Sequence, residues 1–291
     1  MNFAPLALLL VSVLWGMTFV AVKSGLQDSS PLLFVGIRFA VASVATLPLL
    51  RSRGSGAAWR AGIPLGVVLA AGYASQTLGL AVTTPSRSAF ITGLNVALVP
   101  LWAVLLLGKR ARKLSLVGLG ITLPGLWLFT SPGGASWNVG DSWTVVCAVF
   151  FALHVILINK YGASLDRGGL LVSQLVVTAV LCLAVAPMLE PLRLDLSGRL
   201  VTALLLTAIL ATTGTTWLQL RFQPRVDPTR AALLYVTEPL FAAGFSWLFT
   251  GETMPAIGWL GGALILAGMI LSELGSGGEG DPAGSVMPNP D

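Results

Sequence analysis

The 291-residue chain is 55% hydrophobic and 10% charged, and its formal net charge is +5 at pH 7. Soluble domains carry about 25% charged residues, so this composition, with a mean hydropathy of +0.85, excludes an ordinary soluble protein. The basic residues lie in short loops between apolar runs, which argues against a nucleic-acid-binding face. The apolar runs are about 20 residues long, the length that crosses the hydrocarbon core of a bilayer. The composition therefore indicates an integral membrane protein.

Hydropathy over windows of about 19 residues predicts ten membrane spans joined by short loops rich in Pro, Gly, Ser and Asp. We expect the first span to be retained rather than cleaved as a secretory signal, because no basic region precedes it and no small-residue cleavage site follows it. Residues 275–291 lack apolar periodicity, so we expect a disordered cytoplasmic tail. The predicted spans are residues 3–23, 32–50, 59–80, 86–107, 114–130, 142–160, 170–189, 200–220, 229–249 and 256–271.

The sequence from Gln76 to Leu128 recurs later in the chain at a constant offset and without a gap. Gln76 matches Gln219 (219 − 76 = 143), and Leu128 matches Leu271 at the same offset. Such a repeat predicts two copies of one unit, which we place at residues 1–131 (spans one to five) and 140–274 (spans six to ten). Further matches are Asn95 with Glu238 at the same offset and, in the first two spans of each half at an offset of 136, Thr18 with His154 and Arg38 with Gln174.

Five spans in each copy is an odd number, so the second copy must lie upside down relative to the first. Inverted repeats of this kind build secondary transporters, with a binding site near mid-membrane where the copies meet. Short loops rich in Lys and Arg stay in the cytoplasm, and twelve basic residues follow even-numbered spans whereas four lie on the opposite side, so we expect both termini in the cytoplasm. The twelve are Arg51, Arg53, Arg60, Lys109, Arg110, Arg112, Lys113, Lys160, Arg167, Arg221, Arg225 and Arg230, and the four are Lys23, Arg87, Arg193 and Arg199.

Both halves contain small residues before a proline within a span, and a glycine followed by a charged residue where that span ends. With ten spans in two five-span repeats, this pattern resembles the EamA group of the drug/metabolite transporter superfamily. The Gly-Glu pair typical of that family is present only in the second half. The matching residues are 89–100 with Gly108 and Lys109 in the first half, and Ala231, Ala232 and Pro239 with Gly251 and Glu252 in the second.

The resemblance implies an all-α membrane protein with ten helices around a central cavity, and a transporter rather than an enzyme, with no cofactor. It further implies export of neutral or aromatic amino acids and related metabolites across the bacterial inner membrane by alternating access. A drug or nucleotide-sugar carrier of the same superfamily is the alternative, although a diphosphate requires more basic groups than Arg38. A channel or membrane enzyme is the alternative of another class. An enzyme needs paired catalytic groups at depth, and only Glu238 and His154 are available.

Three ionisable residues lie deep within predicted spans, where polar groups usually face a water-filled path or another helix. Glu238 lies about ten residues, or roughly 15 Å, from the start of its span and could bind protons or substrate amines, or pair structurally with Arg38. Arg38 could receive a substrate carboxylate through its planar fork, or hold two helices together. His154 could handle protons or form a helix–helix hydrogen bond. No Cys or acid lies at ligand spacing from it, so we expect no metal site.

Gln76 with Gln219 and Asn95 with Glu238 occupy equivalent positions of the two halves, and together with aromatic residues on the same spans they predict a small-molecule cavity. Arg87 and Arg230 each open a helix, where the macrodipole disfavours a cation, so they contact either lipid phosphate or a gate partner. The glycine-rich fifth and tenth spans are expected to pack closely as a scaffold. The predicted substrate-binding residues are Trp15, Thr18, Arg38, Tyr73, Gln76, Asn95, His154, Trp217, Gln219, Tyr235 and Glu238. The expected partners are amino acids, membrane lipid and, if transport is coupled, protons.

Overall fold

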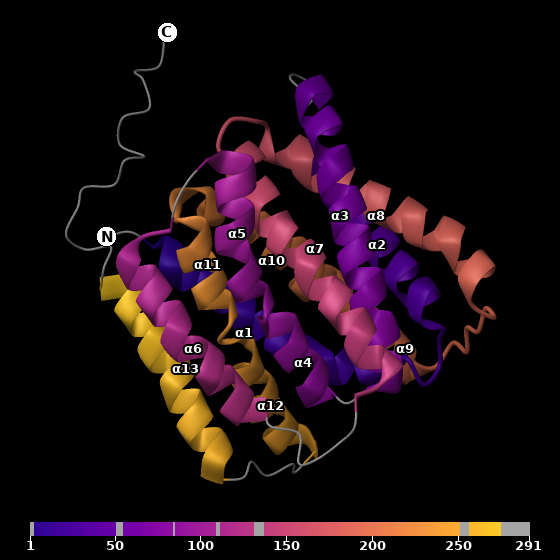
Figure 1. Cartoon of the computed structure of the whole chain (residues 1–291). Coiled ribbons are helices and arrows are strands. Elements are labelled where there is room, and N and C mark those ends of the chain that lie inside the picture. Colours follow the sequence, from indigo (N-terminus) through magenta and orange to yellow (C-terminus); the bar gives the residue numbers. More distant parts are fainter. Residues whose placement is uncertain are drawn as a thin grey trace, which may run out of the picture.

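The structure, a computed structural model, describes residues 3–50, 55–83, 85–108, 111–130, 137–250 and 256–274. These residues are mainly helical (Figure 1), and the β-structure within them is one isolated bridge between Ser29 and Leu194. Seven helices are long and apolar enough to cross a membrane, and three shorter apolar helices correspond to the predicted fourth, fifth and tenth spans. The expected all-helical membrane fold is confirmed at this level. The shorter three comprise Ile91–Leu107, Lys113–Leu128 and Ala256–Leu271.

The elements follow one another in the same order in the two halves. The first half contains α1 (Ala4–Gly25), α2 (Pro31–Thr46), the 3-10 turn η1 (Leu47–Leu49), α3 (Ser55–Val82), α4 (Pro85–Gly93), α5 (Asn95–Leu107) and α6 (Lys113–Thr130). The second half contains α7 (Val139–Tyr161), α8 (Arg167–Leu189), α9 (Gly198–Ala208), η2 (Ile209–Gly214), α10 (Thr215–Phe222), η3 (Gln223–Arg225), α11 (Pro228–Tyr235), α12 (Glu238–Thr250) and α13 (Ala256–Leu274). Lys109, Gly251, Glu252 and the predicted tail lie outside the described residues.

Local sequence signals set several of the helix ends. Asn138 begins α7 with a capping box, in which its side chain accepts the N–H of Asp141 at 3.1 Å and the Asp141 carboxylate accepts the N–H of Asn138 at 2.8 Å. Each bond satisfies a backbone donor that would otherwise lack a partner at the helix start. Gly108 ends α5 in the left-handed conformation with φ of 62°, which a residue without Cβ adopts at low cost.

Two predicted spans are interrupted where the sequence pattern suggested continuous helices. The predicted span 86–107 is broken at Leu94, between α4 and α5, and the span 229–249 is broken after Tyr235, between α11 and α12. The turn bonds are equivalent: Leu94 donates to Ile91 at 3.2 Å in the first half, and Thr237 donates to Leu234 at 3.3 Å in the second. The two breaks are therefore the same structural feature, 143 positions apart.

The causes of the two breaks differ. In the second half Pro239 is the second residue of α12, and it has no N–H to donate to the carbonyl of Tyr235 four residues earlier, so the helix cannot continue unbroken through this turn. In the first half α4 ends on Gly93 instead, and glycine weakens a helix interior. The predicted eighth span, 200–220, is also irregular, because its middle turn η2 is a π-helix. The second candidate span reaches Leu49, close to the predicted residue 50, but its α-helical part α2 ends at Thr46 and continues as the 3-10 turn η1, since Pro48 cannot donate the next α-helical bond.

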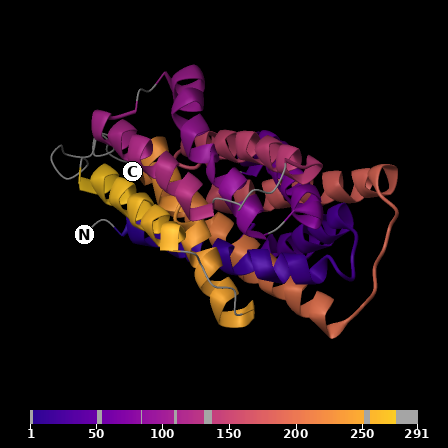
Figure 2. The same ribbon diagram turned by 60° about the horizontal axis from the view of Figure 1, so that its bottom comes forward.

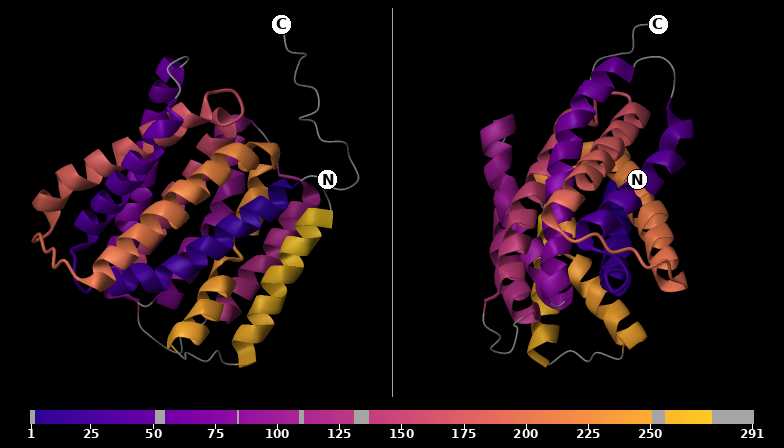
Figure 3. Two further views of the ribbon diagram at one scale, coloured as in Figure 1. Left: turned by 180° about the vertical axis from the view of Figure 1, so that it is seen from behind. Right: turned by 90° about the vertical axis from the view of Figure 1, so that its right-hand side faces the viewer.

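The main contacts of first-half helices with second-half helices have counterparts in which the two halves swap roles. Helix α1 packs on α12, and its counterpart α7 packs on α5, the counterpart of α12. Helix α3 packs on α7, and its counterparts α9 and α10 pack on α1. The left view of Figure 3 shows α1 lying between α9–α10 and α12. This arrangement brings α1, α3, α7 and α10 together with both broken helices in the middle of the bundle.

The two glycine-rich helices α6 and α13 pair at one edge of the bundle, as Figure 2 shows from below. A Cβ added to Gly268 would lie 2.5 Å from the carbonyl oxygen of Gly118, and one added to Gly125 would lie 2.9 Å from that of Gly261. Only glycine permits such an approach of two backbones. The predicted close contact between the fifth and tenth spans is thus confirmed.

Candidate functional site

A cavity lies in the middle of the bundle, bounded by α1, α2, α3, α5, α7, α10, α11 and α12. Its free volume, measured as the space available to the centres of water molecules, is about 50 Å³. Because one water needs roughly 10–15 Å³ by this measure, the cavity holds a few waters and must widen to admit a metabolite. The lining residues are Trp15, Thr18, Phe19, Val22, Arg38, Leu69, Tyr73, Gln76, Thr77, Leu80, Asn95, Phe151, His154, Val155, Thr216, Gln219, Tyr235 and Glu238.

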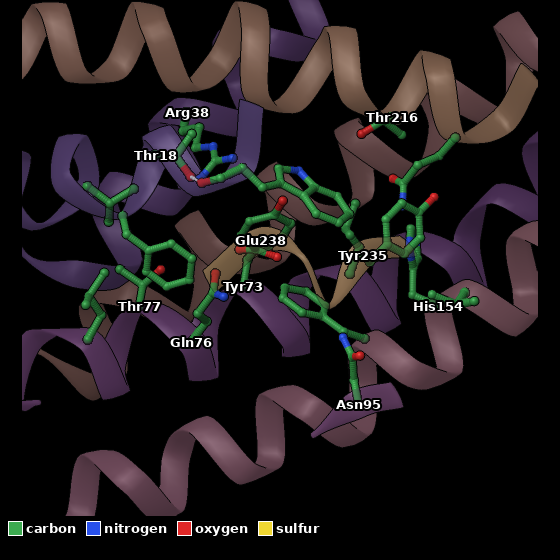
Figure 4. A pocket seen from close by; sticks show the side chains of 18 residues that line it. Thr18, Arg38, Tyr73, Gln76, Thr77, Asn95, His154, Thr216, Tyr235 and Glu238 are labelled. Atoms are coloured by element: carbon green, nitrogen blue, oxygen red, sulfur yellow. Dashed lines mark hydrogen bonds between the residues drawn. The ribbon is translucent and has the colours of Figure 1, made fainter. Parts of the chain in front are cut away.

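The lining is largely made of residue pairs that occupy equivalent positions in the two halves. Gln76 and Gln219 both contribute, as do Asn95 and Glu238, each of which begins the second part of a broken helix. Figure 4 shows Gln76, Asn95, Tyr235 and Glu238 entering the same space from four different elements. The cavity therefore lies where the two halves meet. The other equivalent pairs are Tyr73 with Thr216, Trp15 with Phe151, Thr18 with His154, and Phe19 with Val155.

Arg38 is fixed at one side of the cavity by the irregular turn η2. The residue is 3% exposed; its Nε donates to Thr212 Oγ1 at 2.7 Å and its Nη2 donates to the carbonyl of Ala211 at 3.3 Å. The guanidinium carbon lies 4.7 Å from the ring centre of Tyr73, a cation–π distance. Arg38 has five N–H donors, and these two bonds occupy two of them. The π-helix thus presents an oxygen pair that orients the guanidinium.

Glu238 enters the cavity at the first turn of α12, where the helix macrodipole favours a negative charge. It is partly exposed to the cavity, and among the residues that the structure describes no side chain donates a hydrogen bond to its carboxylate. The expected alternative of a direct pair with Arg38 is absent, because no nitrogen of Arg38 lies within 4.0 Å of a Glu238 oxygen. Both charges therefore face the cavity separately.

Aromatic rings form two walls of the cavity. Trp15 and Tyr235 pack with ring centres 5.2 Å apart, and Trp15 Nε1 donates to Thr215 Oγ1 at 3.2 Å. In a second group Tyr73 packs edge-on against Phe39 and Phe151, at 5.0 and 5.1 Å between ring centres. These contacts fix the ring orientations and offer apolar surface to a ligand.

A polar network that the sequence pattern did not reveal supports the Tyr235 wall. Gln223 accepts the Tyr235 hydroxyl at 2.9 Å and donates to Asn159 Oδ1 at 2.6 Å and to the carbonyl of Val155 at 2.7 Å. Gln219 reaches the same Gln223 oxygen at 3.5 Å. The network links α7, α10 and α11, and it satisfies side chains that would be costly to bury without partners.

His154 and Trp217 differ in their placement. His154 is buried and its Nε2 lies 3.0 Å from Gln174 Oε1, a bond between α7 and α8 that supports the helix–helix alternative. Trp217 does not line the cavity: it is 38% exposed, and its ring lies 5.2 Å from the guanidinium carbon of Arg221. Its inclusion among the substrate-binding residues is therefore corrected. Of the eleven predicted residues the other ten line the cavity.

The two predicted gate residues lie at helix starts. Arg230 occupies the first turn of α11 and is partly exposed, and its backbone N–H donates to the capping carboxylate of Asp227 at 3.3 Å. Arg87 lies in the first turn of α4, but its side chain falls outside the described residues. In the part of the chain that the structure describes, no three His, Cys, Asp or Glu side chains gather closely enough to hold a metal ion.

Lys23, at the last turn of α1, lies next to one end of the cavity. Its Nζ donates to the carbonyls of Leu80 at 2.7 Å, Thr83 at 3.1 Å and Ala81 at 3.3 Å, which are terminal acceptors at the end of α3. Lys23 and Ala81 line a second, more open hollow, whereas the neighbouring Val22 and Leu80 line the central cavity. Lys23 thus lies between the two hollows and joins α1 to α3.

An ion pair connects the α1–α2 loop to the start of α9 at the same end of the bundle. Arg199 Nη2 lies 2.6 Å from Asp28 Oδ1, and Ser197 Oγ donates to Asp28 Oδ2 at 2.6 Å. The hydrogen bond from Arg199, followed by that from Ser197, lowers the pKa of Asp28 to about 2. Asp28 is therefore ionised across the physiological range, and the α1–α2 loop remains attached to the start of α9.

Comparison with known proteins identifies the family. The EamA-like transporter family matches residues 2–131 and 138–274. An uncharacterized transporter of Archaeoglobus fulgidus is 29% identical over 94% of this chain and 86% of its own length, and the uncharacterized inner membrane transporter YedA of Escherichia coli K12 is 26% identical over 92% and 90%. A crystal structure of a protein 18% identical in sequence superposes with a TM-score of 0.77 over 93% of this chain and 96% of that one, which shows the fold. The chain is a multi-pass membrane protein and belongs to the EamA-like transporter family.

Proposed function

We propose that this protein is a secondary transporter that exports amino acids, neutral and aromatic ones foremost, across the inner membrane by alternating access. The observation that carries the proposal is the central cavity, which is lined by equivalent residues of both halves at the breaks of two helices. Discontinuous helices at mid-membrane are where transporters of this kind bind their substrates. The cavity offers aromatic rings that can contact an apolar side chain, and one basic and one acidic side chain that can contact a carboxylate and an ammonium group, so it suits an amino acid better than a sugar.

We further propose that the two halves, residues 1–131 and 140–274, are inverted repeats. The exchange of helix neighbours between the halves and the equivalent breaks at Leu94 and Thr237 support a twofold relation. An odd number of crossings in each half would then make the relation an inversion. Rocking of one half against the other would widen the small cavity toward each side of the membrane in turn.

The orientation that we propose has both termini in the cytoplasm, because basic residues concentrate in the loops of that side. Lys23 and the Asp28–Arg199 pair then lie at the periplasmic end. The state described here would be closed to the periplasm. Arg87 and Arg230 remain gate candidates at helix starts, with lipid phosphate as the other partner.

Counterflow in proteoliposomes tests this function. Vesicles containing the purified protein are loaded with an unlabelled amino acid, sugar or drug, and uptake of the labelled compound is followed. We expect accelerated exchange of neutral or aromatic amino acids and none of nucleotide sugars. Exchange of sugars or drugs without amino acids would refute the proposed substrate class, and conduction at channel rates without counterflow would refute a carrier.

A further inference from the structure

The lining of the central cavity comes largely from equivalent positions of the two halves, so it is nearly symmetric between them except for its charged residue types. Its two charged residues break that symmetry, one in each half. Arg38 has the neutral counterpart Gln174 in the second half, and Glu238 has the neutral counterpart Asn95 in the first. The cavity therefore has a basic side chain on its α2 side and an acidic side chain on its α12 side.

Each of these charges lacks a charged partner among the residues that the structure describes. Arg38 is buried and bound to a hydroxyl and a carbonyl, and Glu238 receives no hydrogen bond there. A buried charge is costly unless it is paired. The two do not pair with each other within 4.0 Å. A ligand that carries both charges would compensate both.

From this arrangement we propose that the cavity recognises the zwitterionic head of an α-amino acid, with its carboxylate on Arg38 and its ammonium group on Glu238. This inference rests on the proposed transport of amino acids and names the groups that select them. The fixed guanidinium offers a planar fork for a carboxylate, and Figure 4 shows Arg38 and Glu238 reaching the cavity from separate helices. A lone amine or a lone acid would leave one buried charge uncompensated.

The remaining lining determines where the amino acid side chain lies. Trp15 and Tyr235 form one aromatic wall and Tyr73 belongs to the other. Gln76 and Asn95 add neutral hydrogen-bonding groups to the same lining. An apolar or aromatic side chain lies against these rings, whereas a second carboxylate would meet no further arginine or lysine in the lining. We therefore expect acidic amino acids to be excluded.

Competition against wild-type counterflow tests the proposal without a variant. Labelled L-phenylalanine is the substrate, and the competitors are unlabelled phenylalanine, phenethylamine, which lacks the carboxylate, and 3-phenylpropionate, which lacks the amine. We expect each incomplete analogue to compete at least tenfold more weakly than phenylalanine. Equal competition by either analogue would overturn the assignment of the group that it lacks.

Variants then assign each group to its residue. Glu238→Gln should lower the preference for phenylalanine over 3-phenylpropionate at least tenfold and leave the preference over phenethylamine in place. Arg38→Gln should give the reverse, and Trp217→Phe, outside the cavity, serves as the control. If a folded variant binds phenylalanine, phenethylamine and 3-phenylpropionate more weakly by the same factor, the assignment of the two groups is overturned, although the proposed transport of amino acids still stands. Absence of amino acid exchange in the wild type would instead refute the proposed function itself.

Discussion

Loss of the Lys23 side chain should open one end of the central cavity. The ammonium group donates to three carbonyls at the end of α3, at 2.7, 3.1 and 3.3 Å. A hydrogen bond from a charged donor contributes about 1.5–3 kcal/mol when buried, and Lys23 is only partly buried, so we assign about 2 kcal/mol to the whole contact after allowing for solvent. Lys23→Met should therefore shift the equilibrium between the closed and the open form of this cavity end roughly 30-fold toward the open form.

A single reporter cysteine measures that shift. Thr77 lines the cavity and is 3% exposed, so Thr77→Cys, with Cys147 and Cys182 replaced by alanine, reports access to the cavity. A membrane-impermeant thiol reagent is added outside intact cells, and the labelling rate is compared with and without Lys23→Met. We expect labelling to accelerate at least tenfold. Lys23→Arg keeps the charge and the donors and should label nearly as slowly as the parent, whereas unchanged labelling in Lys23→Met would refute the closure by Lys23.

Three further changes test the scaffold, the loop contact and the limits of the cavity. Gly268→Ala places a Cβ 2.5 Å from a backbone oxygen, whereas the Cβ of Gly120→Ala meets nothing within 4 Å. Thermal unfolding in detergent should therefore show Gly268→Ala to be less stable than Gly120→Ala by about 1–3 kcal/mol. Equal stability of the two variants would contradict the close contact between α6 and α13. Since the pKa of Asp28 is depressed to about 2 by Arg199, its stabilising contribution is complete above the unfolded pKa near 4 and is lost as pH falls through about 2. The melting-temperature difference between wild type and Asp28→Asn should accordingly be constant from pH 7 to about 5 and shrink only in stronger acid, and a difference that vanishes near pH 6 would contradict this. Trp217→Ala should keep the counterflow rate within about twofold, and a loss of substrate affinity would return Trp217 to the binding site.

The repeat offset is the strongest source of information in the sequence. It pairs Gln76 with Gln219 and Asn95 with Glu238 from residue types and spacing alone, and all four line the cavity. Periodicity corrects one error: Trp217 lies two residues before Gln219, about 200° around a helix, so the two cannot share a face. The same rule favours Thr216, three residues before Gln219, which lines the cavity but was not among the predicted residues.

Other features depend on contacts that no local pattern encodes. The break at Leu94 has no proline beside it, and its equivalence to the break at Thr237 emerges only from the turn bonds. The π-helix η2 is stabilised in part by Arg38, which is 174 positions from Thr212. The partners of Gln223 similarly come from α7 and α11. Long-range pairs of this type decide where a helix departs from regular geometry, so propensity could not predict them.

Access to Thr77→Cys from each side of the membrane tests the central claim most directly. In proteoliposomes of known orientation, an impermeant thiol reagent is applied to one face at a time, with and without a transported amino acid. A cavity that alternates between the two faces predicts labelling from both, and slower labelling from both when substrate occupies it. Labelling from one face only, or labelling that no amino acid alters, would contradict a shared binding cavity between the two halves.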